Sequence, residues 1–482
     1  MKDRQVPEES FAGQAVTVMG LGLHGGGAAA ARFFAGEGAR VTVTDLRSES
    51  ELADSIESLE GLPVRYVLGR HDEADFREAD IVVKNPAVRR NSPYLALARR
   101  IETDVSVFLA RNPARLAVVT GTKGKSSTTA AIHHVLSRAG ETAYLGGNIT
   151  RSPLDFLPDL AEAEHGATVV LELSSFQLGD LALTPAGIGA LTPEVAVITG
   201  IYRDHLDYYG TMEDYIADKR LVYAGQGPRD WTIARDDETG LSFLAETPAR
   251  PAVLHDEPPE SLGSERSEVD ATPTGAAHAY LDGNRGIARI AHVEEEIVPE
   301  EVSLRGFHMR RNLLAAGLAA RLLGVSAPQV REATASFGGI AHRLEPVGEH
   351  RGIRFYNDSA ATIPEAALAA VKSFEEPVHL IAGGSTKNVD FAPFAEITRR
   401  VTALYLLEGS AQEAVLDAVE KGASEMPLYG PFHSLETAVA EAVSRARAGE
   451  AVVLSPGCAS FGMFRNEFHR GDRFRDIVRG LS

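Results

Sequence analysis

One segment constrains the fold of this chain more than any other: an apolar run at 116–120, a glycine-containing loop, and a helical pattern that continues to residue 136. In such strand–loop–helix units the glycines let backbone N–H groups converge on phosphates, the lysine reaches the β- and γ-phosphates, and a hydroxyl reaches Mg²⁺. The loop is not a strict Walker A motif, because Val119 occupies the place of the first glycine. It still predicts an ATP or GTP site, made of Gly121, Thr122, Lys123, Gly124, Lys125, Ser126 and Ser127.

Strand and helix patterns alternate along the whole chain. Apolar strand patterns at 15–19 and 40–45 flank an alanine-rich helix pattern, and this βαβ arrangement opens a parallel sheet. The alternation resumes with the phosphate-binding segment and again after residue 342. We therefore expect α/β domains with largely parallel sheets.

The length of 482 residues is too great for one ordinary core, and about 150 residues per domain gives three domains. We predict a Rossmann-like domain at 1–112, a central P-loop-type ATPase domain at 113–341, and a C-terminal Rossmann-like domain at 342–482. The acidic, proline-rich stretch between 236 and 301 reads as a partly β elaboration of the central domain, whose role the sequence does not reveal.

Charge and composition exclude several classes of protein. The net charge of −19 repels phosphate backbones, so nonspecific nucleic-acid binding is not expected. Cys458 is the single cysteine, which excludes an intrachain disulfide framework. The first ten residues lack the apolar core of a signal peptide, and no run reaches the ~18 apolar residues of a membrane helix. We expect a cytoplasmic protein without a membrane span.

A glycine fingerprint, Gly20-x-Gly22-x-x-Gly25, follows the first strand, and Asp45 ends the next one. This is the dinucleotide-binding arrangement in outline. The pattern itself indicates only that a backbone approaches a phosphate-like group at a helix N-terminus. A bound nucleotide, a redox cofactor and a purely structural turn all remain possible from the pattern alone.

An acidic residue, Glu172, interrupts the apolar strand in LELSSFQL. A buried carboxylate is costly unless a cation compensates it, so a metal partner is a reasonable inference. Further along lie Asp204-His205-Leu206-Asp207 and then Lys219 in a helix-like stretch. Taken singly, His205 is more often an ordinary polar residue, and Lys219 is more often a solvated helix lysine.

Six ordered motifs together resemble the Mur ligases over essentially the whole chain: TGTKGKSS, LELSSFQL, DHLD followed by Tyr215-x-x-x-Lys219, HRLE, NDSAAT and LSPGCAS. The resemblance implies an ATP-dependent, ADP-forming ligase that makes an amide bond through an acyl phosphate, in peptidoglycan precursor synthesis. LELSSFQL and the segment from SPGCAS to F-x-R-G-D-x-F favour the member that adds glutamate. The implied substrates are UDP-N-acetylmuramoyl-L-alanine and D-glutamate, and we expect a monomer.

In this family the N-terminal domain holds the UDP moiety, so the resemblance reassigns the glycine fingerprint to a uridine nucleotide. The positions that match the substrate contacts are Leu23, Asp45, Arg47, Pro86 and Asn148. His24 and Ala87 stand where a threonine and a glycine are common.

The resemblance also assigns the ATP and metal site, with ATP and two Mg²⁺ ions as the expected cofactors. Lys125 would contact the terminal phosphates, and Ser126 and Glu172 would hold one Mg²⁺. His205 and Lys219 would serve the second Mg²⁺, the lysine as its CO2-derived carbamate, because an ammonium cannot ligate a metal. The matching nucleotide contacts are Asn312, Arg343 and Asp358, while Met309 replaces an expected asparagine.

The resemblance places the incoming amino acid against Thr362, Lys387 and Ser460, which suit a dicarboxylate because each carboxylate needs charge-assisted donors. Ala360, Ile363 and the order Asn466-Glu467-Phe468 depart from the family pattern, so L-glutamate remains possible in place of D-glutamate. A folylpolyglutamate synthetase, a non-catalytic nucleotide-binding regulator and a nicotinamide dehydrogenase also remain possible identities for the chain.

Overall fold

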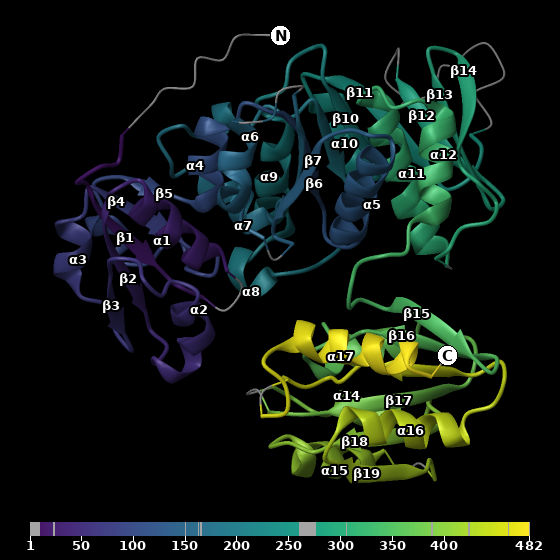
Figure 1. The fold of residues 1–482 in the computed structure, drawn as a ribbon. Helices are drawn as coiled ribbons and strands as arrows, with labels where there is room; N and C mark the ends of the chain where they lie inside the picture. Colours follow the sequence, from purple (N-terminus) through teal and green to yellow (C-terminus); the bar gives the residue numbers. More distant parts are fainter. Residues whose placement is uncertain are drawn as a thin grey trace. The chain divides into compact units, whose positions relative to one another are not determined.

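The computed structural model describes residues 10–22, 25–149, 151–161, 163, 166–259, 276–304, 306–386, 389–422, 425–460 and 462–481. The chain divides into two compact units, Met1–Phe337 and Gly338–Ser482. Each is an α/β structure, as predicted (Figure 1). The finer boundaries at 112/113 and 341/342 stay a prediction.

The first unit begins with a five-stranded sheet in the order β3-β2-β1-β4-β5. All of its strand pairs are parallel. Helix α1 packs closely on the turn after β1, because a Cβ at Gly27 would overlap the Gly20 carbonyl oxygen. The elements are β1 (Ala15–Met19), α1 (Gly26–Gly36), β2 (Arg40–Asp45), α2 (Ala53–Glu57), β3 (Val64–Leu68), α3 (Glu73–Arg77), β4 (Ile81–Lys84), β5 (Ile101–Glu102) and α4 (Asp104–Arg111).

The same unit contains a nine-stranded sheet in the order β14-β13-β12-β11-β10-β9-β6-β8-β7. The strands from β7 to β12 are parallel, whereas β12, β13 and β14 pair antiparallel. Its elements begin with β6 (Arg115–Thr120), α5 (Lys125–Arg138), β7 (Ala143–Gly147), α6 (Leu157–Ala161), β8 (Thr168–Glu172), α7 (Ser175–Leu181), β9 (Val195–Ile198), α8 (Leu206–Tyr209) and α9 (Met212–Arg220). They continue with β10 (Trp231–Arg235), α10 (Glu238–Glu246), β11 (Arg250–His255), β12 (Ala277–Asp282), β13 (Arg285–Ile290), β14 (Val293–Val298), α11 (Phe307–Leu322) and α12 (Ala327–Ser336).

Helices cover both faces of this sheet. On one face α5 and α11 lie side by side and share a core with α12 (Figure 1). The core of the other face is continuous with that of the first sheet, running from Val16 in β1 through Phe108 in α4 to Val253 in β11. The acidic stretch contributes β11–β14 where it is described, in agreement with the predicted β elaboration.

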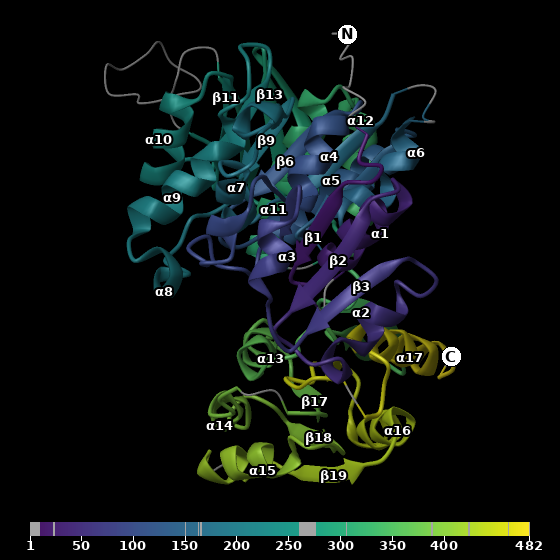
Figure 2. The same cartoon turned by 90° about the vertical axis from the view of Figure 1, so that its left-hand side faces the viewer.

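The second unit is one six-stranded sheet, β15-β16-β20-β17-β18-β19, in which only the edge strand β15 pairs antiparallel. Helices α13, α14 and α15 cover one face, and α16 and α17 cover the other (Figure 2). The elements are β15 (Glu345–His350), β16 (Ile353–Asn357), α13 (Pro364–Val371), β17 (Val378–Gly383), α14 (Pro393–Ile397), β18 (Ala403–Leu407), α15 (Gln412–Lys421), β19 (Leu428–Phe432), α16 (Leu435–Arg445), β20 (Ala451–Leu454) and α17 (Glu467–Arg479).

None of the helices that the structure describes combines the length and the apolar character needed to cross a bilayer.

Candidate functional site

The predicted phosphate loop joins β6 to α5 at the carboxyl edge of the central sheet. Gly124 caps α5 in the left-handed conformation, at φ 85°. A Cβ there would lie 2.6 Å from Asn312 Oδ1, so the structure brings Asn312 of α11 against the loop. Lys125 Nζ donates to the Thr122 carbonyl oxygen at 3.0 Å. The loop thus presents a helix N-terminus, which favours an anion.

Glu172 ends β8 in register with Val119 of β6, so it lies at the sheet edge from which the phosphate loop begins. The side chain is 1% exposed, and Oε1 accepts a hydrogen bond from Asn148 Nδ2 at 3.0 Å. Oε2 is buried and has no hydrogen-bond partner among the described residues. A buried carboxylate oxygen without a donor carries a large desolvation cost, which a bound cation would offset. This oxygen is therefore suited to be a Mg²⁺ ligand.

The residues after Glu172 fix how α7 starts. Ser174 Oγ accepts from the Gln177 backbone N–H at 3.2 Å, and Gln177 Oε1 accepts from the Ser174 backbone N–H at 3.0 Å. This reciprocal pair is a capping box, which satisfies two N–H groups that the first helical turn would otherwise leave free. The SSFQ part of the motif thus places the helix directly behind the carboxylate.

Lys219 of α9 is not a solvated helix lysine. It is 1% exposed, and its Nζ donates to the Gly121 carbonyl oxygen of the phosphate loop at 2.7 Å. The Tyr215 ring lies 4.5 Å from Nζ, and the Tyr215 hydroxyl is 2.9 Å from Thr122 Oγ1. Burial, reinforced by the nearby Lys125 ammonium, lowers the pKa of Lys219 from 10.5 to about 7.

His205 stands beside this cluster in a left-handed conformation, at φ 54°, where α8 begins. Its ring contacts those of Phe176 and Tyr215, with centroids 5.0 and 6.1 Å away. Tyr215 thus neighbours both His205 and Lys219. The side chain of His205 is 45% exposed, so it remains accessible to a ligand.

A second cluster lies at the carboxyl ends of β1, β2 and β4. Asp45 is buried; its Oδ2 accepts from the Gly22 backbone N–H at 3.1 Å, and its Oδ1 accepts from the Arg47 backbone N–H at 2.9 Å. Asn85 Nδ2 donates to the Gly20 carbonyl oxygen at 3.2 Å, which holds the loop containing Pro86 against the glycine turn. Ligands of open parallel sheets bind at this edge. Leu23 lies outside the described residues.

Asn85 was not among the predicted residues. The only sequence signal was an asparagine directly after an apolar strand, a pattern common in many turns.

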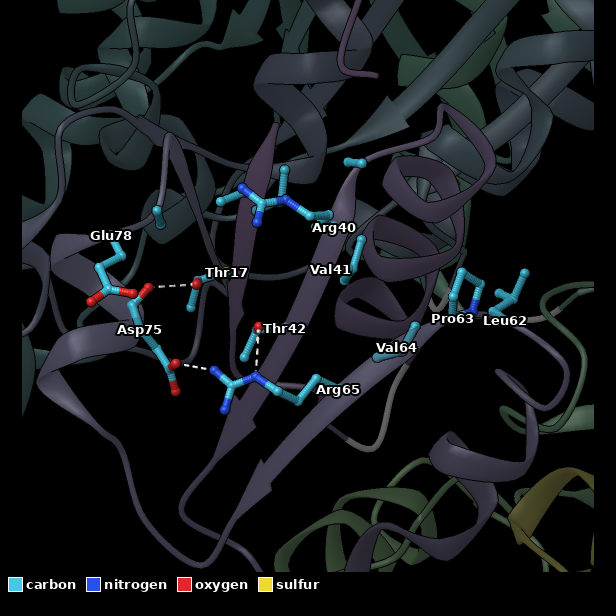
Figure 3. A pocket seen from close by; sticks show the side chains of 14 residues that line it. Thr17, Arg40, Val41, Thr42, Leu62, Pro63, Val64, Arg65, Asp75 and Glu78 are labelled. Carbon is cyan, nitrogen blue, oxygen red and sulfur yellow. Dashed lines mark hydrogen bonds and ion pairs between the residues drawn. The ribbon is translucent and has the colours of Figure 1, made fainter. Parts of the chain in front are cut away.

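A pocket of about 610 Å³ lies at the opposite, amino ends of β1, β2 and β3 (Figure 3). There Thr17 Oγ1 donates to the Asp75 carbonyl oxygen at 2.7 Å, and Arg65 Nε donates to Thr42 Oγ1 at 3.3 Å. Its lining does not include Asp45, so it is separate from the cluster around that residue.

In the second unit Asp358 follows β16 and is buried. Oδ2 accepts from Ser455 Oγ at 2.6 Å, and Oδ1 accepts from the Leu344 backbone N–H at 3.1 Å. Burial raises the pKa of Asp358 from 3.8 to about 6, while the nearby Arg343 guanidinium opposes that rise. Arg343 and Asp358, which were both predicted to contact the nucleotide, therefore lie close together.

The loops that carry Thr362 and Ser460 also meet. The Gly457 backbone N–H donates to the Ala361 carbonyl oxygen at 2.9 Å. Ser460 Oγ is buried and lacks a hydrogen-bond partner in the part of the chain that the structure describes. A buried hydroxyl whose hydrogen-bonding capacity is unused is suited to bind a polar ligand. Lys387 falls outside the described residues.

Arg470 of α17 joins these two loops, and it was not among the predicted site residues. It is 0% exposed and donates to Ser359 Oγ and to the Ser359 carbonyl oxygen, both at 2.9 Å, and to the Cys458 carbonyl oxygen at 3.2 Å. Burial lowers the pKa of Arg470 to about 10. The sequence showed it only as one letter of the F-x-R-G-D segment.

Three family models match successive segments of the chain, and several relatives match it over nearly its whole length. Residues 14–107 match the family described as "Mur ligase MurD-like, N-terminal domain", 119–320 match "Mur ligase middle domain", and 342–458 match "Mur ligase, glutamate ligase domain". A protein of Roseiflexus sp. (strain RS-1) is 41% identical over 98% of this chain and 100% of its own length, and one of Treponema pallidum (strain Nichols) is 38% identical over 97% and 98%. Both are named UDP-N-acetylmuramoylalanine--D-glutamate ligase.

The chain belongs to the Mur ligase family.

Mur ligases are ATP-dependent enzymes that form amide bonds, so the predicted enzyme class is confirmed. The three-domain α/β fold is confirmed as well. The structure is also similar to that of UDP-N-acetylmuramate-alanine ligase from Thermotoga maritima, with a TM-score of 0.56 and 19% identity over 97% of this chain and 100% of that one. At that identity the likeness bears on the fold alone.

The structure locates three of the residues that depart from the Mur ligase pattern. Met309 packs against the core under α5 and α11. Ile363 is 39% exposed, and Phe468 is 37% exposed with its ring centroid 5.5 Å from that of His342.

Proposed function

We propose that this chain joins UDP-N-acetylmuramoyl-L-alanine to D-glutamate with ATP, as a step in building the peptidoglycan precursor. The relatives of this name support the substrates. The observation that carries the site is the meeting of the phosphate loop, the unpartnered Glu172 oxygen and the Lys219 amine. A triphosphate and a carboxylate repel each other, and the Lys125 ammonium, the N-terminus of α5 and the cations that Glu172 would help to hold can offset that repulsion.

In the proposed mechanism the alanyl carboxylate attacks the γ-phosphate of ATP, giving an acyl phosphate and ADP. The glutamate amine then attacks the activated carbonyl, and a tetrahedral intermediate collapses to the amide and phosphate. Lys125 and the backbone N–H groups of the loop orient the terminal phosphates. Two Mg²⁺ ions, when bound, would neutralise developing charge on the phosphate oxygens. Their proposed ligands are Ser126, Glu172, His205 and Lys219.

We propose further that Lys219 acts as a carbamate. Forming it requires the neutral amine to attack CO2, so that an N–C bond forms and a proton leaves. Burial favours the neutral amine at a pH where an exposed lysine is almost wholly protonated. The modified side chain would carry carboxylate oxygens, which are ligands that Mg²⁺ prefers.

The remaining assignments follow the domains. Residues 1–112 would hold the UDP-sugar through Leu23, Asp45, Arg47 and Pro86, with Asn148 contributing from the central domain at 113–341. Asn312, Arg343 and Asp358 would contact ATP, and Thr362, Lys387 and Ser460 of 342–482 would hold glutamate. We place the enzyme in the cytoplasm, where its nucleotide substrates are made. We propose that it acts as a monomer.

Phosphate release from Mg-ATP and UDP-N-acetylmuramoyl-L-alanine tests this function, with D-glutamate, L-glutamate or no amino acid added. The Lys125→Met variant is the control for ATP use by the site. Release that requires D-glutamate supports the proposal. Release with L-glutamate alone would reassign the amino-acid pocket, and no release with either would favour a folylpolyglutamate synthetase or a non-catalytic regulator.

A further inference from the structure

A partly buried ion network crosses from the first sheet of the first unit to the helices behind the proposed metal site. Lys84 and Asp180 form an ion pair in which both side chains are 0% exposed. Arg90 Nε donates to Asp180 Oδ1 at 3.0 Å, and its Nη atoms bind both carboxylate oxygens of Asp218. The Tyr209 hydroxyl donates to Asp218 Oδ2 at 2.8 Å.

Arg90 reaches these carboxylates by lying directly on α7. A Cβ at Gly179 would overlap both Arg90 Nη2 and Asp218 Oδ2. The position is therefore restricted to glycine as long as the guanidinium stays between the two carboxylates. The close approach and the ion pairs are two independent observations, and both indicate that the Arg90 guanidinium has one defined position.

The two carboxylates belong to the helices that carry the proposed chemistry. Asp180 lies in α7, which starts three residues after Glu172, and Asp218 directly precedes Lys219 in α9. On the other side, Lys84 Nζ also donates to the Asn85 carbonyl oxygen at 3.3 Å. Asn85 in turn holds the glycine turn of the proposed UDP site.

Stability alone is a weak reason for such a network. Taking the Lys84 and Asp180 charges out of water, and partly burying those of Arg90 and Asp218, costs about as much as their attraction returns. Well-packed apolar groups therefore often serve stability equally well. A bidentate guanidinium does fix geometry, because its donors lie in one rigid plane.

We propose that Arg90 is a positioning residue for the reaction: it fixes α9, and with it Lys219, against α7 and the loop that follows β4. The proposal rests on the proposed function, because the part played by Lys219 belongs to that function. Arg90 itself acts through Asp180 and Asp218.

The test compares Arg90→Met and Asp218→Asn, singly and together, with Arg99→Met as the matched control. Arg99 forms an exposed ion pair with Asp80 inside the first sheet's own domain.

We expect Arg90→Met to lower kcat by about 100-fold, as a small misplacement of a catalytic group does. KM for the UDP substrate should stay within a factor of about 3, because no binding group is lost. The double variant should be little worse than either single one, since both break one connection. Additive losses, or a rise in KM without a fall in kcat, would overturn the proposal.

Gly179→Ala provides a second route, since its methyl group displaces the guanidinium while every charge is kept. We expect it to reproduce the fall in kcat if it folds.

Hydrogen–deuterium exchange of the α9 peptide gives a readout that does not depend on activity. Exchange there should become faster in Arg90→Met and stay unchanged in Arg99→Met. Unchanged exchange in Arg90→Met would reject the positioning role even if the enzyme is active, whereas a wild type that ignores D-glutamate would reject only the proposed function.

Discussion

Lys219 Nζ lies 2.7 Å from the carbonyl oxygen of Gly121, so an amine from α9 is hydrogen-bonded to the loop that is proposed to hold ATP. Helix and loop are separated by 98 positions in the sequence. Their contact places the amine that is proposed to become a metal ligand beside the loop that is proposed to hold the phosphates.

Replacing Lys219 with alanine should lower kcat by about 1,000-fold, because the variant loses a ligand on which charge stabilisation in the transition state depends. Short carboxylic acids should restore part of the rate by supplying the missing carboxylate oxygens. Phosphate release with and without added formate or acetate measures this. Lys421→Ala, at an exposed helical position, should keep wild-type activity. Full activity of the unaided Lys219→Ala variant would contradict the assignment.

The pKa of Lys219 predicts how carbamoylation depends on pH. Below a pH of about 7 the side chain is protonated and cannot attack CO2, and above it the free amine predominates. After CO2 has been removed, the rate of reactivation at a fixed CO2 concentration should therefore rise through pH 7 and then level off. Stopped assays from mildly acidic to strongly basic pH would measure that rate. A rate that still climbs steeply near the pKa of a free lysine, about 10.4, would indicate an ordinary lysine.

Glu172→Gln should separate activity from stability. The variant keeps the shape and can still accept from Asn148, but it no longer offers a carboxylate to a metal. We expect kcat to fall by about 100-fold or more, since a metal-binding charge is lost. Without Mg²⁺ its thermal midpoint should equal or exceed that of the wild type, because a buried charge is removed. Differential scanning fluorimetry with and without Mg²⁺ should show metal stabilisation only in the wild type, and equal stabilisation of both would argue against this metal site.

Asp358 should make the second unit more stable in mild acid. Its pKa is about 6 in the folded chain and near 3.8 when unfolded, so between these values the folded state binds more protons. The contribution of this group to stability therefore falls as pH rises from about 4 to 6, by on the order of 3 kcal/mol in total. Urea unfolding followed by hydrogen exchange in β16 and β20 measures this. Asp358→Asn should lack that part of the slope, and an unchanged slope would show that another group is responsible.

Arg470→Met should weaken glutamate use more than ATP use, because the guanidinium ties together the loops that carry Thr362 and Ser460. We expect KM for glutamate to rise by about tenfold, while KM for ATP changes less. Arg470→Lys should recover little, since an ammonium cannot reach both loops in one plane. Steady-state kinetics with each substrate varied would decide. Equal changes in both KM values would point to a general loss of folding instead.

Much of the fold could be predicted because its signals are local. The βαβ alternation and the strand–loop–helix unit at 116–136 each lie within one short stretch, where periodicity and glycine placement report the conformation. The capping box at Ser174 is equally local, being complete within four residues.

The residues that the sequence did not reveal depend on contacts between distant parts of the chain. Arg90 meets Asp180 and Asp218 across 90 and 128 positions. No pattern near Arg90 distinguishes it from Arg89, which is exposed. Arg470 is equally invisible, because arginine is almost never fully buried and a helical arginine is expected to face solvent. The role proposed for Lys219 came only from the resemblance, since by itself it looked like a surface lysine.

The continuous core that runs from Val16 to Val253 bears on how the protein can be divided into fragments. Cleavage near residue 112 would separate β1 and α4 from apolar partners beyond the cut, so neither piece would retain its complete interior. The second unit has two cores of its own, and none of its described residues belongs to the continuous core of the first unit. Separate expression of the second unit should therefore start at about Gly338, and the two N-terminal domains should be kept together in any chimera between relatives.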